Sequence, residues 1–217
     1  MWASDKYGRE LLTMVGTESH RRTQGERRAD ARQRVLAAAT ELVARHGSRA
    51  VSLASVGVAA GYSRGIVNHH FGSKARLLEE LIEYTQQFEV SADAATGLDR
   101  LVNFVERYLG GMHHRSPRSE AFLKLWVEST AAEPSLATVF AERDARFREH
   151  LVQQIREGIK DGSVDDGVDP ETVAVAMIGL LRGTALMVFS TARDVPAARI
   201  AEEITWMIAR GLAPSPR

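Results

Sequence analysis

Two side chains in the first third of the sequence are suited to reading the edges of nucleic-acid bases. Arg64 can donate two parallel hydrogen bonds to guanine, and Asn68 can pair bidentately with adenine. They are four residues apart, so on a helix both lie on the same face. Gly65, next to Arg64, lets the backbone approach bases or phosphate closely. The pattern predicts contacts to base edges, with a solvated surface as the alternative.

Several residues near this pair suit contacts to phosphate groups. They fall at the starts of expected helices or on the same side as the pair, where a polar group can fix the register of a duplex without reading its sequence. These candidate DNA-contacting residues are Ser52, Ser63, His69, His70 and Lys74.

The elements that must position these residues are three helices. A first helix is predicted over 28–46, because apolar residues recur there at the spacing of one helix face, and Gly47 follows in the place of a C-terminal cap. Ser52 is the predicted N-cap of a short second helix that ends at Gly61, and Ser63 caps a third. The turn Gly61-Tyr62-Ser63 is typical of a helix-turn-helix.

The rest of the chain also follows a helical pattern, so the expected fold class is all-α. Glycines and prolines break the pattern at intervals, and no period-two strand pattern competes with it. The predicted helices run from Lys74 towards Phe88 and then over 98–113, 118–131, 135–161, 171–192 and 196–211. The expected domains are a flexible basic arm over 1–27, a helix-turn-helix domain over 28–74 and a helical domain over 75–217.

Charge is distributed unevenly along the 217 residues, although the net formal charge is zero. Residues 20–76 carry eleven basic and three acidic side chains, whereas residues 77–217 carry 15 basic and 22 acidic ones. A positive segment of this kind attracts a polyanion, and the acidic remainder repels one. A basic surface with no partner is the alternative.

Composition narrows the remaining classes of function. The absence of cysteine excludes disulfides, thiolate catalysis and thiolate metal sites. No run of about 18–20 uninterrupted apolar residues and no apolar signal core is present, so we expect a soluble, cytoplasmic protein with no membrane partner. Adjacent His113 and His114 point about 100° apart and lack a chelating neighbour, so no metal site is predicted. No common catalytic motif was found, and we expect neither an enzyme nor a cofactor.

The run VSLASVGVAAGYSRGIVNHHFGSKARLLEEL, over 51–81, resembles the DNA-binding signature of the tetracycline-repressor (TetR) family of bacterial regulators. The most specific matches are Ala60-Gly61-Tyr62-Ser63, Gly65, His69, Phe71, Ser73-Lys74 and Leu77-Leu78. The resemblance implies an all-helical homodimer that binds a palindromic operator in double-stranded DNA and lets go when a small-molecule effector enters the C-terminal domain. It makes 63–70 the reading residues, Ser52 and Lys74 phosphate anchors, and Phe71 a core aromatic residue.

The sequence departs from the family pattern at four positions. Asn68 and His70 stand where tyrosines are frequent, and Ile66 stands where a small or hydroxylated residue is frequent. Ser55 stands where an acid commonly completes a capping box with Ser52, a loss expected to cost about 0.5–1 kcal/mol of local helix stability at most. These departures leave the fold assignment intact and make the operator sequence hard to deduce.

The second half resembles the BetI-like branch of the family in Arg156-Glu157-Gly158-Ile159, Asp161-Gly162, Asp169-Pro170-Glu171 and Leu180-Leu181-Arg182-Gly183. This resemblance implies that the last two long helices of each subunit form a four-helix dimer interface. Two stripes at helical spacing suit that role, although both could instead line the core of a single chain. The predicted interface residues are Gly179, Gly183, Leu186, Ser190, Ile200, Ile204 and Ile208.

A ligand cavity is expected among the middle helices, where large apolar residues cluster in a chain with only 6% aromatic residues. Such residues also serve as ordinary core. The predicted ligand-binding residues are Phe104, Tyr108, Met112, Phe122, Trp126, Phe147 and Met177. The favoured function is thus a ligand-responsive dimeric regulator, with repression favoured over activation. The alternative is a helical protein-interaction adaptor that keeps the fold without reading DNA.

Overall fold

The computed structural model describes residues 23–85, 94–111, 116–131, 134–190 and 194–214. Within these ranges the regular structure is entirely helical, which confirms the all-α class expected from the periodicity. The elements are α1 (Gln24–His46), a 3-10 turn η1 (Ser48–Ala50), α2 (Leu53–Ala60), α3 (Arg64–Phe71), α4 (Lys74–Thr85), α5 (Gly97–Gly110), α6 (Pro117–Ala131), α7 (Pro134–Asp161), α8 (Pro170–Ser190) and α9 (Ala197–Leu212).

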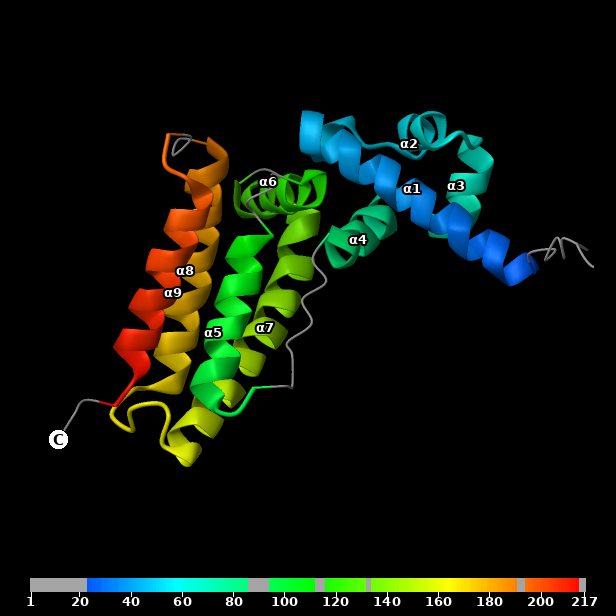
Figure 1. Ribbon diagram of the computed structural model, residues 1–217. Coiled ribbons are helices and arrows are strands. Elements are labelled where there is room, and N and C mark those ends of the chain that lie inside the picture. The colour runs from blue at the N-terminus through cyan, green and yellow to red at the C-terminus, as the bar shows by residue number, and fades with distance from the viewer. Residues whose placement is uncertain (1–22, 86–93, 112–115, 132–133, 191–193, 215–217) are drawn as a thin grey trace, which may run out of the picture.

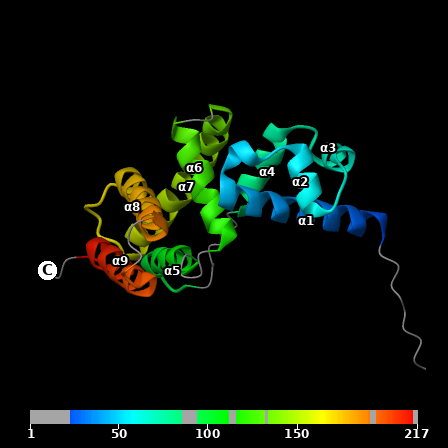
Figure 2. The same ribbon diagram turned by 90° about the horizontal axis from the view of Figure 1, so that it is seen from above.

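The helices form two units that lie next to each other (Figures 1 and 2). The α1–α4 helices gather at one end of the molecule, and α5, α7, α8 and α9 run alongside one another as a bundle. Helix α6 lies between the bundle and α1, against which it packs. Helix α4 packs on α1 and α3 on one side and on α6 and α7 on the other, so it links the two units. The domain boundary predicted at 74/75 falls at the start of this linking helix.

Helix α1 begins at Gln24, so the last residues of the predicted arm, 24–27, are helical. The Thr23 hydroxyl accepts the Glu26 N–H at 3.2 Å, and the Glu26 carboxylate accepts the Thr23 N–H at 2.6 Å. This capping box satisfies two of the N–H groups that a helix start leaves open. Apolar periodicity could not reveal the first turn, because that turn carries no apolar side chain. Residues 1–22 lie outside the described part of the chain.

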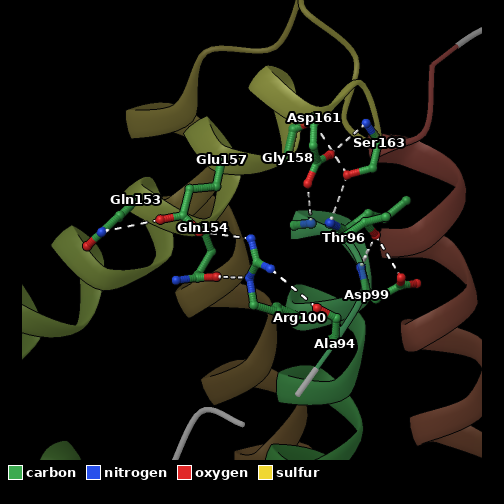
Figure 3. Close-up of polar contacts among 12 residues, drawn as sticks. Ala94, Thr96, Asp99, Arg100, Gln153, Gln154, Glu157, Gly158, Asp161 and Ser163 are labelled. Atoms are coloured by element: carbon green, nitrogen blue, oxygen red, sulfur yellow. Dashed lines mark hydrogen bonds and ion pairs between the residues drawn. The ribbon is translucent and has the colours of Figure 1, made fainter. Parts of the chain in front are cut away.

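The start of α5 is seated directly on the end of α7 (Figure 3). The Asp161 carboxylate accepts the Gly97 N–H at 2.8 Å, and the Ser163 hydroxyl accepts the Leu98 N–H at 3.1 Å. Arg100 reaches back to α7, donating to the Gln154 side chain at 2.6 Å and to the Glu157 carboxylate at 2.8 Å. Two residues of the BetI-like segment, Glu157 and Asp161, therefore join the start of α5 to the end of α7.

Close backbone approach at this junction requires glycine. A Cβ atom on Gly97 would lie 2.3 Å from the Gly158 nitrogen and 2.4 Å from its Cα atom, and neither backbone atom can rotate away. Overpacking of this kind costs about 1–3 kcal/mol and occasionally more. We therefore expect Gly97→Ala to lower the melting temperature by several degrees, at about 2–4 °C per kcal/mol.

The matched control is Gly110→Ala in the same helix, where an added Cβ atom would meet nothing within 4 Å. Alanine favours helix over glycine, so this variant should melt at or slightly above the wild-type temperature. Thermal unfolding followed by circular dichroism compares the two variants. Equal melting temperatures for them would show that α5 and α7 separate easily and that the close contact does not matter.

Helix α8 is long and apolar enough to span a bilayer by length and composition, although polar residues such as Arg182 interrupt its apolar run. A third of its most apolar window is buried inside the chain. Its Arg182 is 3% exposed and forms a bidentate ion pair with Asp144 of α7. The helix therefore packs in the bundle through one face, which leaves a second apolar face uncovered in the single chain.

Candidate nucleic-acid interface

A compact helix-turn-helix forms the outer edge of the first unit. The Ser52 hydroxyl accepts the Ser55 N–H at 2.9 Å, and the Ser55 hydroxyl accepts the Ser52 N–H at the same distance. Ser55 thus completes the capping box that an acid was expected to complete, because a hydroxyl oxygen can accept the same hydrogen bond. Gly61 ends α2 with a φ of 75°, in the left-handed region that favours glycine.

The turn packs against α2 at a second glycine. An added Cβ atom on Gly57 would lie 2.9 Å from the Tyr62 carbonyl oxygen, so only glycine lets the turn approach this closely. The Ser63 hydroxyl then caps α3 by accepting the Ile66 N–H at 3.3 Å. These contacts fix the direction in which α3 leaves the turn.

Helix α3 divides into an anchoring face and an outward face. Val67 and Phe71 are buried, and the Arg32 guanidinium of α1 lies 5.9 Å from the centre of the Phe71 ring. Phe71 is the core aromatic that the family resemblance implied. The predicted reading residues Ser63, Arg64, Gly65, Asn68 and His69 are all exposed, and His70 is half-buried.

The polar groups best suited to base and phosphate contacts are available for them. The side chains of Arg64, Asn68 and Lys74 make no hydrogen bond or ion pair within the described ranges. Such donors can form hydrogen bonds to a ligand without breaking a contact inside the protein. Ser52 is exposed beside them, although its hydroxyl already caps α2.

A groove of about 800 Å³ runs between the start of α1 and α3. One wall is lined by four of the predicted DNA-contacting residues, Ser63, Gly65, His69 and His70. The other wall is basic and was missed by the sequence reasoning, which placed part of it in a flexible arm. The additional lining residues are Gln24, Gly25, Arg27, Arg28, Ala31, Tyr62 and Ile66.

The surroundings of His70 disfavour its protonated form. Burial lowers the pKa of His70 below its ordinary value of 6.5, and the positive charges of Arg28, His69 and Arg32 lower it further, against an opposing effect of Glu80. The imidazole of the free chain is therefore mainly neutral at pH 7.

In the second unit, the described members of the predicted ligand-binding set lie on α5, α6, α7 and α8 and are buried or packed against the core. The Phe104 ring lies 5.4 Å from that of Phe147 and 6.1 Å from that of Tyr108, between centroids. Burial raises the pKa of Tyr108 to about 12, so its hydroxyl stays protonated. Met177 is buried on α8, whereas Met112 lies outside the described residues. In this structure the described members of the set pack as core, and their role in ligand binding stays a prediction.

A charged pair that sequence reasoning did not find lies among these aromatic residues. Besides holding Asp144, the Arg182 guanidinium lies 5.1 Å from the Trp126 ring centre and 5.8 Å from that of Phe122. No sequence signal connects Arg182 with Asp144, since they lie on different helices and 38 positions apart in the sequence.

The predicted interface residues fall into two groups. On α8, Gly179, Gly183, Leu186 and Ser190 are exposed, and an added Cβ atom on either glycine would meet nothing within 4 Å. On α9, Ile204 and Ile208 are 8% and 7% exposed and belong to the core of this chain, and Ile200 packs against that core. Periodicity identifies an apolar face but not its partner. The large apolar residues left exposed on the two helices are Val175, Leu180, Leu186, Met187, Trp206 and Met207.

Helix α6 joins the two units through the end of α1. The Lys124 ammonium donates to the Ala44 carbonyl, and the Glu128 carboxylate accepts the Ser48 N–H at 3.1 Å and 3.3 Å. The opposite side of α6 carries Trp126 beneath Arg182. One helix thus touches both the interior of the bundle and the helix-turn-helix unit.

Helix α4 makes a second connection. The Arg118 guanidinium of α6 donates to the Tyr84 hydroxyl at 2.6 Å and lies over its ring, and Arg146 of α7 pairs with Glu83 at 3.1 Å. Helix α4 also carries Lys74 at its first position, so one helix connects α6 and α7 with the edge of the α3 face.

A helix-turn-helix whose exposed third helix carries donors without partners in the described ranges, joined to a helical second domain, is the architecture of helix-turn-helix transcriptional regulators. Residues 35–81 match the family of bacterial regulatory proteins, tetR family, and residues 97–213 match the BetI-type transcriptional repressor, C-terminal domain. The chain belongs to the tetR family and carries a BetI-type C-terminal domain. Members of this family are transcriptional regulators and not enzymes.

Individual relatives are distant but cover most of the chain. The HTH-type transcriptional regulator SrpR of Pseudomonas putida is 26% identical over 157 residues, which are 71% of this chain and 73% of SrpR. The HTH-type transcriptional repressor KstR2 of Rhodococcus jostii is 26% identical over 149 residues, 64% of this chain and 71% of KstR2.

Solved structures share the fold. The transcriptional regulator FadR of Bacillus subtilis, in complex with stearoyl-CoA, superposes with a TM-score of 0.72 at 17% identity, covering 83% of this chain and 98% of FadR. A candidate transcriptional regulator of Saccharomonospora viridis, in complex with choline, has a TM-score of 0.72 at 23% identity, covering 86% of this chain and all of that one.

Proposed function

We propose that this regulator is a cytoplasmic homodimer that represses transcription by binding a palindromic operator through α3 of each subunit, and that an effector releases it. The single observation that carries this proposal is the exposed α3 face, on which Arg64 and Asn68 are free of partners within the described ranges. Two such helices, held about 34–36 Å apart by a dimer, would enter successive major grooves of B-form DNA.

The uncovered apolar face of α8 and α9 supports the dimer. Met187, Trp206 and Met207 are 53%, 59% and 55% exposed in the single chain. Exposed apolar residues that gather on one face mark an interface, and Gly179 and Gly183 on α8 would let two backbones approach closely. Helices α8 and α9 lie at the end of the molecule away from α3 (Figure 2), so pairing through these two helices would leave both reading helices free.

The effector site is proposed in the interior of the bundle, around the aromatic residues and Arg182. FadR holds stearoyl-CoA and the S. viridis protein holds choline, so proteins with this fold accommodate ligands of opposite charge. A ligand that shifts Trp126 on α6 would disturb the Lys124 and Glu128 contacts on the other side of that helix. Helices α6 and α4 would then change the spacing of the two α3 helices, a coupling typically of about 1–3 kcal/mol.

The test is selection of bound DNA from sheared genomic fragments at about 0.15 M salt, a concentration at which weak phosphate binding is reduced. Recovery of one or a few sites containing an inverted repeat is the expected result. Retention without any preferred sequence would overturn the proposal and favour the adaptor that keeps the fold without reading DNA.

Binding should also depend on pH through His70. Phosphate groups favour the protonated imidazole, so the pKa of His70 rises on binding from its lowered value in the free chain. Between the free and bound pKa values binding takes up protons, and affinity therefore increases as the pH falls through the region around and below 6.5. Affinities measured from about pH 5.5 to about pH 7.5, one unit either side of the ordinary histidine pKa, should show this slope.

The variant His70→Gln removes the titrating group while keeping a polar side chain. It should reduce the slope by up to about one proton per subunit, hence by up to about two protons, or a hundredfold change in affinity per pH unit, for the bound dimer. A slope that is unchanged in His70→Gln would assign the proton uptake to another group.

A further inference from the structure

Ile66 is an exposed apolar residue whose side chain is not needed for the stability of the fold. It is 42% exposed at the third position of α3, and it is absent from the residues that pack against the hydrophobic core. Its neighbour Val67 is fully buried, so the anchoring of α3 is already supplied. An isoleucine also favours helix less than alanine does. Neither packing nor helix propensity explains it.

Ile66 lies beside residues that suit contacts to DNA. It lines the groove between α1 and α3 together with Arg27, Arg28 and His69, which suit phosphate contacts. Gly65, immediately before it, presents no side chain, and an added Cβ atom there would meet only the Ser63 hydroxyl within 4 Å. Base edges can therefore come close to this part of α3. Residues in the first turn of a reading helix are the ones that contact bases.

We infer that Ile66 is a specificity-determining residue that packs on the 5-methyl group of a thymine in each half of the operator. The thymine methyl is the apolar group that base edges present in the major groove. The contact would select thymine over cytosine, which lacks the methyl group and presents a hydrogen-bond donor. This inference rests on the proposed function, because it requires that α3 reads DNA.

Deoxyuridine tests the contact without altering base pairing, since uracil is thymine without the methyl group. An operator is first selected with the wild-type protein, and each thymine is then replaced by deoxyuridine at symmetric positions in both half-sites. Fluorescence anisotropy gives the affinity of each duplex. For one thymine per half-site we expect wild-type binding to weaken about fourfold per methyl group, hence about fifteenfold for both.

Ile66→Ala should bind the thymine and deoxyuridine duplexes equally, because the partner of the methyl group is gone. The matched control is Val58→Ala, which removes an 83% exposed valine of α2 that does not line the groove. Val58→Ala should retain the full deoxyuridine effect. Circular dichroism establishes that both variants are folded, as expected for substitutions at exposed helix positions.

Two results overturn the inference while leaving the proposed function intact. One is an operator in which no deoxyuridine substitution weakens wild-type binding, as would occur if Ile66 met only a deoxyribose. The other is an equal deoxyuridine effect in wild type and Ile66→Ala, which would assign the methyl contact to another side chain. Selection that enriches no sequence at all would overturn the proposed function, and this inference with it.

Discussion

The double variant Arg64→Ala/Asn68→Ala is expected to lose at least a thousandfold in affinity for the operator. Each bidentate contact to a base contributes about 1–3 kcal/mol of discrimination, and a dimer makes each contact twice. Both side chains are exposed and make no internal contacts within the described ranges, so their removal should leave the fold unchanged. Affinity should fall to the level of non-specific DNA, typically about 10³–10⁷ below specific binding.

The salt dependence of binding provides the control for this prediction. Phosphate contacts give log K a slope of about −0.9 per neutralised phosphate against log salt, whereas base contacts leave the slope unchanged. Arg28→Ala, in the basic wall of the groove, should reduce the slope by about one per subunit and preserve the preferred sequence. A double variant that still prefers the operator would show that reading occurs elsewhere.

Asp144→Ala is expected to cause the largest loss of stability, about 3–5 kcal/mol. The substitution leaves the Arg182 guanidinium, which is 3% exposed, without its carboxylate partner. Breaking a buried pair costs far more than the pair contributes, because the remaining charge stays desolvated. At about 2–4 °C per kcal/mol, the melting temperature should fall by roughly 6–20 °C.

Two further variants distinguish this cause from a general weakness of α7. Glu83→Ala breaks an ion pair to Arg146 whose side chains are both more than half exposed, and such pairs contribute only about 0–1 kcal/mol. Asp144→Leu/Arg182→Met removes both charges and should recover most of the lost stability. If Asp144→Ala and Glu83→Ala had the same melting temperature, water or another group would have to solvate Arg182 in the Asp144→Ala variant.

Local patterns were sufficient to place the helices and the reading motif. The predicted third helix opens at Arg64 behind the Ser63 cap, and the glycine turn before it has the left-handed Gly61 that its position requires. These features depend on residues within one helical turn of each other, so they can be predicted directly from the sequence. The start of α1 at Gln24 was missed because its capping box is polar and carries no apolar period.

By itself, the sequence determined the all-α class, most helix ends, the helix-turn-helix and the outward polar face of α3. Tertiary structure decided which element each face meets. It turned Ile204 and Ile208 into the chain's own core, placed Arg28 across the groove from His69, and brought Asp144 to Arg182. The physical reason is the distance along the sequence between the residues that interact. Caps and periodicity arise from neighbours a few residues apart, whereas these contacts join separate helices whose packing no local pattern specifies.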